Sequence, residues 1–472
     1  MYFLLPFKFR RIGDKEVLVN EPGNFLIVPQ GTAKRIVERD IRGNEELYKD
    51  LVSGWFISEK PIPDLIDNLA VRLHTKKAFL DDFTSLHIFV LTLRCNQNCI
   101  YCQVSSRKDS SDSFDMQEKD LENAVGLMMQ SPSPSITVEF QGGEPTLVPE
   151  LIKKAVIRTE EINESLHKDI TFVICSNCVD ISDDLLAFCK LHNIYFSVSF
   201  DGPGFLHNHN RGKQDSFERF QYGLARIRDA LGNDHISPLM TTSVESLKYP
   251  KAIIDSYLAT GFNHIFLRPL NPYGAASKQI DWRNYSRQFI QFFKESLLYI
   301  IEKNLEGFFI AEDCSTIILR KILTPFSDGF VDLQSPSGII NGVIVYNYDG
   351  YVYASDEARM MAESGDYSFR IGPISADYQT IFYGEKAQIL SDIWCNECIA
   401  GCSDCAYQQY CGADPVRNHT TQHDSYGFRP NSNLCMIHRS IIDFIFELLI
   451  LREKDVFPVF QSWITGRRVK YD

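Results

Sequence analysis

The chain has 472 residues, of which 44% are hydrophobic and 12% aromatic, so it is long enough to fold into two or three domains with sizeable cores. A formal net charge of −13 at pH 7 argues against general nucleic-acid binding. The thirteen cysteines cluster in short spacings without a secretory signal, which predicts metal binding in a reducing compartment, the cytoplasm, rather than disulfide bonds.

Residues 1–84 are predicted to form a small α+β module of the β3α3 type. The strands are expected at 8–12, 16–20 and 24–28, and helices at 32–37 and 45–55. No residue of this segment carries chemistry of its own. The module is therefore predicted either to cap the domain that follows or to bind a partner.

Three cysteines follow the apolar run 88–91 in the pattern C-x3-C-x2-C. They are Cys95, Cys99 and Cys102, and Tyr101 stands directly before the last of them. Three thiolates cannot close a four-iron cluster, so one iron would keep an open position for a chelating co-substrate, as catalytic metal sites do. A zinc knuckle or three core thiols is the alternative interpretation.

A second motif, Gly142-Gly143-Glu144-Pro145, ends the apolar strand expected at 136–141. Two glycines let the backbone approach a ligand closely, and a neighbouring carboxylate can accept hydrogen bonds from an ammonium group. With the cysteine loop one βα unit upstream, this motif resembles the radical S-adenosylmethionine (SAM) enzymes.

The resemblance implies a cofactor and a co-substrate. In that family the three cysteines hold a 4Fe-4S cluster, which passes one electron to SAM and cleaves it to methionine and a 5′-deoxyadenosyl radical. The glycine motif meets the amino group of the methionine moiety of SAM. Tyr101, inside the cysteine loop, is counted with the cofactor-binding residues.

The middle of the chain alternates strand and helix patterns. Apolar runs that each precede a helix-period segment lie at about 85–93, 136–141, 170–175, 194–200, 237–243 and 264–268. These predict parallel strands with right-handed crossovers, and six such units form a partial (β/α)6 TIM-like barrel, which resembles the radical SAM core. Residues 85–310 are assigned to this α/β core.

Two further strand ends resemble segments that surround the ribose and carboxylate of SAM in the family. Asn177 follows the strand at 170–175, and Ser199 lies in the strand at 194–200, with Arg211 shortly downstream. The resemblance implies that these three residues also bind SAM. No catalytic residue is assigned.

Residues 311–440 contain a second cysteine-rich region. Cys402, Cys405 and Cys411 follow a C-x2-C-x5-C pattern, and Cys435 comes later. The pattern resembles the SPASM extension of radical SAM enzymes that modify peptides, which implies one auxiliary 4Fe-4S cluster with every iron ligated. A zinc site is the alternative interpretation.

A full SPASM domain holds a further auxiliary cluster, and here the sequence departs from the family pattern. Ser337, Ser355 and Pro415 stand where the family commonly has cysteines, so that cluster is predicted to be absent. Cys395 and Cys398 fall outside the pattern, and whether they join a metal site stays open.

Residues 441–472 are predicted to form a C-terminal helix and tail. The apolar stretch 441–451 is interrupted by Asp443 and Glu447, so it indicates a buried or partner-facing helix rather than a membrane span.

Three short strings resemble the His-Xaa-Ser-system radical SAM maturases. They are Asn96-Gln97-Asn98, the segment from Cys411 to Pro415, and the opening Phe3 to Phe7. The resemblance implies a ribosomally made precursor peptide with His-Xaa-Ser repeats, a second radical SAM maturase, and an electron donor such as flavodoxin or ferredoxin. The β3α3 module then resembles a precursor-recognition domain that binds a leader peptide as an added strand.

Two other functions stay open at the level of sequence. An anaerobic sulfatase-maturing type of enzyme would share the same scaffold. A non-catalytic iron-sulfur scaffold is disfavoured, because both the open-cluster loop and the glycine motif are intact.

Overall fold

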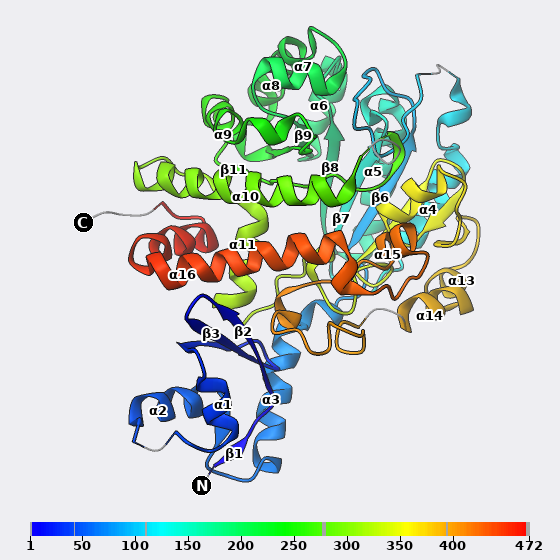
Figure 1. Cartoon of the computed structure of the whole chain (residues 1–472). Helices are drawn as coiled ribbons and strands as arrows, with labels where there is room; N and C mark the ends of the chain where they lie inside the picture. Colours follow the sequence, from blue (N-terminus) through cyan, green and yellow to red (C-terminus); the bar gives the residue numbers. More distant parts are fainter. Residues whose placement is uncertain (1, 42, 109–110, 276–279, 393–394, 469–472) are drawn as a thin grey trace.

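The computed structural model describes residues 2–41, 43–108, 111–275, 280–392 and 395–468. The fold is α/β, with a central sheet of eight strands. The N-terminal module lies at one end of the molecule, and the C-terminal helix runs beside the helices that follow the central strands (Figure 1).

The N-terminal module is built on a three-stranded antiparallel sheet. Its strands are β2 (Phe7–Ile12), β3 (Lys15–Asn20) and β4 (Phe25–Pro29), with β3 in the centre, and β1 (Phe3–Leu4) pairs with β5 (Ile57–Ser58). Its helices are α1 (Thr32–Val37), α2 (Glu45–Ser53) and α3 (Pro63–Lys76). Leu18, Ile36 and Phe56 are fully buried in a separate small core, so the module folds around its own hydrophobic centre.

The central sheet follows the predicted βα alternation. Its strands are β6 (Leu86–Thr92), β7 (Ser135–Gly142), β8 (Asp169–Ser176), β9 (Tyr195–Ser199), β10 (Ile236–Leu239), β13 (Val343–Asn347), β14 (Tyr351–Tyr353) and β15 (Arg370–Pro373). They lie in the order β10-β9-β8-β7-β6-β13-β14-β15, and the pairs from β10 to β13 are parallel. The predicted α/β fold with a run of parallel strands is therefore confirmed.

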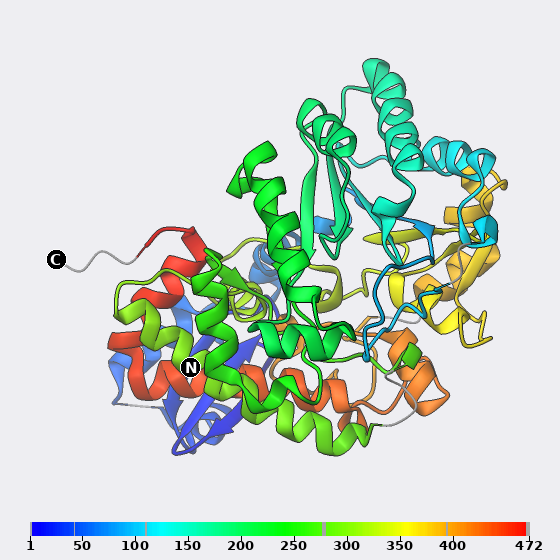
Figure 2. The same ribbon diagram turned by 90° about the horizontal axis from the view of Figure 1, so that it is seen from above.

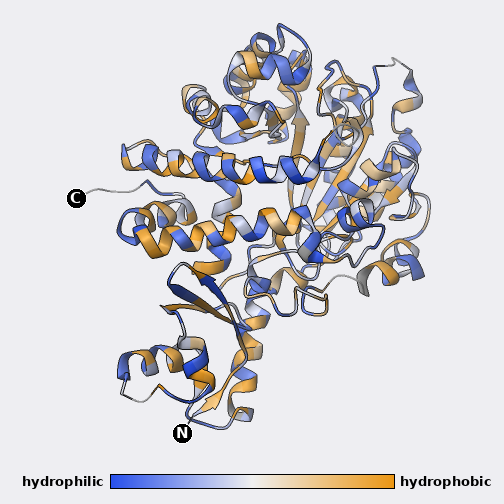
Figure 3. Ribbon diagram, viewed as in Figure 1, coloured by the Kyte–Doolittle hydropathy of each residue, from blue (hydrophilic) through white to orange (hydrophobic). Residues whose placement is uncertain are grey.

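Helices cover this sheet from outside (Figure 2). They are α4 (Glu118–Met128), α5 (Pro149–Leu166), α6 (Asp183–Leu191), α7 (Gly204–Arg211), α8 (Ser216–Leu231), α9 (Pro250–Ala259) and α10 (Trp282–Leu305). Hydrophilic and hydrophobic residues alternate along them, as amphipathic helices on a buried sheet require (Figure 3).

The two ends of the predicted strand series differ from expectation. The sixth strand, expected at 264–268, is confined to β11 (His264–Ile265), which pairs with β12 (Ala311–Glu312) and not with β10. On the other side, β13 pairs with β6, so the sheet includes strands from beyond residue 310. Local hydrophobic patterns could not reveal that pairing, because its partners are about 250 residues apart along the chain.

The remaining helices gather around the second cysteine-rich region. They are α11 (Asp313–Leu323), α12 (Asp356–Ala362), α13 (Tyr378–Tyr383), α14 (Glu385–Asp392), α15 (Pro415–Gln422) and α16 (Asn433–Thr465). The predicted C-terminal helix is part of α16, which packs against α10 and α11 with its apolar residues buried. In the described parts of the chain, no helix combines the length and hydropathy needed to cross a membrane.

Candidate functional site

The cysteine loop starts where β6 ends and is fixed by backbone hydrogen bonds on two sides. Cys95 N donates to Arg107 O (3.0 Å), while Ile100 N donates to Asn210 O of α7 (2.9 Å). Burial raises the pKa of the Cys95 thiol to about 12 and that of Cys99 to about 11. The free thiols are therefore protonated at neutral pH, and a bound metal would have to displace their protons.

The two glycines of the second motif are required by the fold of this loop. Gly142 has φ 153°, and a Cβ there would lie 2.0 Å from Thr92 O. A Cβ on Gly143 would lie 2.3 Å from Arg94 O. Any side chain at either position would push the end of β7 away from the cysteine loop, so the glycines keep the two motifs together.

Glu144 is buried behind the same loop, with 1% of its surface exposed. It accepts hydrogen bonds from Thr146 Oγ1 (2.8 Å), Ser176 Oγ (2.9 Å) and Asn177 N (2.8 Å). Burial raises its pKa, and these donors oppose that rise. The carboxylate thus ties the end of β8 to the glycine motif, and this holds Asn177 beside the loop, where its side chain donates to Asn96 Oδ1 (2.8 Å).

Asp201 is a site residue that sequence reasoning did not assign. It is fully buried and accepts hydrogen bonds from Tyr101 OH (2.7 Å) and Arg211 Nε (2.8 Å). Although burial alone would raise it, the pKa of Asp201 is lowered because Arg211 stabilises the carboxylate. A buried arginine needs a counter-charge, so Arg211 is the sequence signal that points to an acidic partner such as Asp201.

All ten residues predicted for the cluster and SAM line one cavity of about 230 Å3, called here the cysteine pocket. They are Cys95, Cys99, Tyr101, Cys102, Gly142, Gly143, Glu144, Asn177, Ser199 and Arg211. The structure brings together side chains from several strand ends, loops and helices at the carboxyl edge of the sheet, where ligands bind in parallel α/β folds. Three adjacent thiols facing an open cavity fit a cluster with one free iron position.

The second cysteine set lies between η8 (Gln408–Tyr410), α11 and the start of α16. Burial raises the pKa of Cys402 to about 12 and raises those of Cys405, Cys411 and Cys435. The charges of Cys405, Cys411 and Cys435 act on Cys402, so these thiols lie within electrostatic range of it, although no three His, Cys, Asp or Glu side chains among the described residues are placed to hold a single metal ion. A cysteine-only set of four fits a fully ligated cluster.

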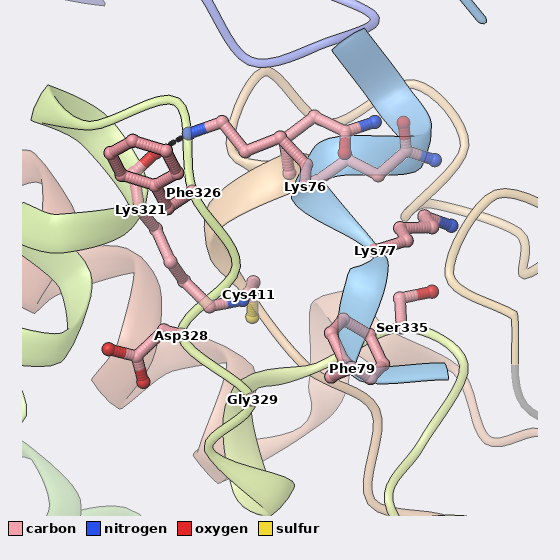
Figure 4. A pocket seen from close by; sticks show the side chains of 11 residues that line it. Lys76, Lys77, Phe79, Lys321, Phe326, Asp328, Gly329, Ser335 and Cys411 are labelled. Carbon is pink, nitrogen blue, oxygen red and sulfur yellow. Dashed lines mark hydrogen bonds between the residues drawn. The ribbon is translucent and has the colours of Figure 1, made fainter. Parts of the chain in front are cut away.

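Cationic side chains surround these four thiols. Arg429 is 4% exposed, donates to Gly412 O (2.9 Å), and lowers the pKa of Cys402 and Cys411 against the effect of burial. Figure 4 shows the half-buried Lys321 side chain extending toward Cys411 beside a small cavity of about 30 Å3. Burial lowers the pKa of Lys321 to about 8. These cations would offset the negative charge of four thiolates.

Cys395 and Cys398 flank a loop that touches that set, since Asn396 Nδ2 donates to Cys411 O (3.1 Å). Cys398 is exposed, and the charges that act on Cys395 come from Glu397, Lys77 and Cys398. Glu397, between the two cysteines, forms an ion pair with Lys77 at 2.7 Å. Whether this pair joins a metal site, the question left open by the sequence, stays open.

The residues that replace cysteines have structural positions of their own. Ser355 caps α12, where its hydroxyl accepts a hydrogen bond from Ala358 N (3.2 Å), and Pro415 is the first residue of α15. Ser337 lines a second cavity, which has a volume of about 320 Å3. Serine and proline at these helix starts follow ordinary capping preferences, so both residues have structural roles at these positions.

Residues 89–255 match the family model described as the Radical SAM superfamily. This segment is therefore a radical SAM domain.

Two curated relatives match parts of the chain. An uncharacterized protein of Methanocaldococcus jannaschii is 31% identical over 116 residues, covering 24% of this chain and 38% of that protein. A cysteine-type anaerobic sulfatase-maturating enzyme of Clostridium novyi is 28% identical over 132 residues, covering 26% of this chain and 35% of that enzyme. The chain thus spans well under half the length of these two relatives.

Solved structures share the fold over most of the chain. The structure of native anSMEcpe with bound AdoMet has a TM-score of 0.64 at 19% identity and covers 79% of this chain and 100% of that chain. The structure of Streptococcus suis SuiB bound to the precursor peptide SuiA has a TM-score of 0.52 at 13% identity and covers 91% of this chain and 98% of that one.

Proposed function

We propose that this radical SAM enzyme modifies a ribosomally made precursor peptide or protein. The observation that carries the proposal is the cysteine pocket, in which three thiols from one loop face the same cavity as the residues expected to bind SAM. The similarity to solved structures described with bound AdoMet and bound peptides supports it. A His-Xaa-Ser precursor is the narrower proposal, and it rests on short sequence strings alone.

The residues of the pocket have separate tasks in this proposal. When bound, the cluster and SAM supply the radical that abstracts a hydrogen atom from the substrate. Cys95, Cys99 and Cys102 hold the cluster, while the Gly142-Gly143 backbone keeps the loop against β7. The buried Asp201 orients Arg211, which presents a fixed positive charge to the pocket and matches the carboxylate of SAM.

We also propose one auxiliary 4Fe-4S cluster at Cys402, Cys405, Cys411 and Cys435. The support is a buried cysteine-only set close to cationic side chains, which suits a fully ligated, negatively charged cluster. Such a cluster has no open iron position, so its task would be electron transfer or structural support.

The N-terminal module has two possible tasks, and contacts support each. Strands β2 and β4 are the edges of its three-stranded sheet and could pair with an extended leader peptide. Arg10 of β2 forms a bidentate ion pair with Asp443 of α16 (2.9 and 2.6 Å), which suits a docked cap. We favour precursor binding, because a leader peptide can pair with the β4 edge while the ion pair between Arg10 of β2 and Asp443 persists.

Deletion of residues 1–80 tests this assignment. Precursor affinity should fall while SAM cleavage without substrate persists, since the cysteine pocket contains no residue from the deleted segment. Unchanged affinity in a folded truncation would return the module to the role of a structural cap.

Further partners follow from the chemistry. Cleavage of SAM requires an electron, so we propose a low-potential donor such as flavodoxin or ferredoxin, and a second radical SAM maturase as a co-worker on the same precursor. A thiol-ligated open cluster needs reducing conditions, and we therefore propose the cytoplasm as the location.

The decisive experiment is mass spectrometry of a co-expressed precursor. A mass change confined to a His-Xaa-Ser peptide would support the narrow proposal, whereas conversion of a sulfatase cysteine or serine would favour the sulfatase-maturing alternative. No change in either substrate, with normal SAM cleavage, would contradict both.

A further inference from the structure

A second cavity lies inside the barrel next to the cysteine pocket. It has a volume of about 320 Å3 and is called here the inner cavity. The two cavities share six lining residues, namely Glu139, Gln141, Leu239, Arg268, Asn271 and Asp356. A group bound in the inner cavity would therefore lie directly beside the SAM-binding residues.

The far wall of the inner cavity includes positions where the family resemblance would place cluster ligands. Ser337 and Ser355 line the cavity there, and Cys314 is the single thiol among its lining residues. One thiol cannot hold a cluster of four irons. This space is therefore available to another occupant.

The walls of the inner cavity carry more carboxylates than guanidinium groups. The carboxylates are Glu139, Asp332, Asp356, Glu357 and Asp414, and the guanidinium groups are Arg268 and Arg417. Asp356 is paired with Arg359 outside the cavity at 2.7 Å. His438 also lines the wall, and its Nδ1 lies 3.7 Å from Cys411 Sγ.

Of these acids, Glu357 has the weakest compensation of its negative charge by donors and cations. Within the described residues its side chain accepts no hydrogen bond, and its nearest cation is Arg268 Nη2, at 3.9 Å. Burial and the charges of Asp332 and Asp414 raise the pKa of Glu357 to about 8. The empty cavity thus disfavours another negative charge and would stabilise a positive one.

Ser337 provides an independent sign of a missing ligand. Its residue surface is 2% exposed, and its side chain lines the inner cavity. No hydrogen bond of its hydroxyl is found among the described residues, and the hydroxyl is not one of their fully buried unpaired atoms, so it opens into the cavity. An N–H group bound in the cavity would donate to this oxygen.

We propose that the inner cavity receives a cationic side chain of the substrate, whose N–H groups donate to Glu357 and Ser337. This deepens the proposed function, on which it rests, by naming the chemical class of the residue that enters the barrel. Guanidinium, imidazolium and ammonium groups all carry the required charge and donors. A carboxylate or a purely apolar side chain would leave the acids and the hydroxyl uncompensated.

Calorimetric titration of the reconstituted full chain with SAM present tests the proposal. The probes are the N-acetyl methylamides of arginine, histidine and lysine, with citrulline as the neutral isostere of arginine. We expect at least one cationic probe to bind about tenfold more tightly than citrulline. Glu357→Gln should remove that preference, whereas Glu122→Gln, an exposed carboxylate on α4, should retain it.

The possible outcomes separate this proposal from the proposed function. If no cationic probe binds more tightly than citrulline, or if no cationic probe shows saturable binding, the cavity assignment is overturned even when SAM cleavage is normal. Loss of SAM cleavage in the wild type would instead overturn the proposed function. If Glu357→Gln does not fold, Ser337→Ala should still weaken the cationic probe about threefold and leave citrulline unchanged.

Discussion

The two cysteine-rich regions of this protein differ in what surrounds their thiols. Cys95, Cys99 and Cys102 face a cavity of about 230 Å3, together with groups suited to a small charged ligand. Around the second set, the cavity at Cys411 measures about 30 Å3 and is lined by lysines. The first region therefore presents all three thiols to a cavity with room for a co-substrate, whereas Cys411 is the one thiol of the second set that lines this small cavity.

The difference shows how ligand number and packing act together. Three thiols leave a coordination position that is useful only if a cavity adjoins it, and the glycines at the end of β7 keep that cavity next to the loop. Four thiols ligate every iron of a cluster. Arg429 and Lys321 can therefore pack closely around it without blocking an open iron position. The following predictions test this contrast.

The largest effect is expected from loss of the open site. Replacing Cys95, Cys99 and Cys102 with alanine should abolish SAM cleavage, because no ligands remain for the cluster that delivers the electron. Anaerobic assay of 5′-deoxyadenosine formation measures this. The variant should still bind iron at its C-terminal site, and surviving SAM cleavage would contradict the assignment of the loop.

Iron analysis with Mössbauer spectroscopy tests the closed site. The reconstituted wild type should hold about eight irons per chain, and Cys402→Ala with Cys411→Ala should reduce this to about four while sparing substrate-free SAM cleavage. About twelve irons per chain in the wild type, reduced by changing Cys395 and Cys398, would show that this pair holds a further cluster.

The buried ion pair between Asp201 and Arg211, beside the cysteine pocket, is expected to contribute more to SAM affinity than an exposed Asp–Arg pair. Asp201→Asn leaves Arg211 without its counter-charge, so SAM affinity should fall about 10- to 100-fold, as for other residues that orient ligands. Asp180→Asn, which breaks the more exposed pair with Arg219, is the matched control and should change affinity less than about twofold. Equal effects in a binding titration would argue against a positioning role for Asp201.

The smallest effect concerns the strand that carries the open site. His87 of β6 is fully buried, and burial lowers its pKa to about 3, so the folded state binds fewer protons than the unfolded state between pH 6.5 and 3. The free energy of unfolding should therefore decrease as the pH falls, by about 2 kcal/mol between pH 6.5 and 5. The buried His207, with a pKa lowered to about 4, acts in the same direction.

Urea unfolding at the two pH values measures this loss. His74→Gln, at an exposed position, should leave the pH dependence unchanged, whereas His87→Gln should reduce it. A pH-independent wild type would contradict the assignment of a neutral, buried His87.

The sequence alone was sufficient for the parts of this protein that local chemistry specifies. Cysteine spacing identified the loop at 95–102, and the strand that ends at Gly142 and Gly143 follows from an apolar run closed by a turn motif. The five strands β6 to β10 were predictable because a buried parallel strand is a short, continuous apolar segment.

The tertiary structure decided what depends on contacts between distant segments. Asp201 became a site residue because it meets Tyr101, a hundred residues earlier in the chain. No local sequence pattern predicts that β13 pairs with β6, or that Ser337 and Glu357 line the same inner cavity. Hydrophobic periodicity reports which face of a segment is buried, but not which partner covers it, and that choice belongs to the packing of the whole chain.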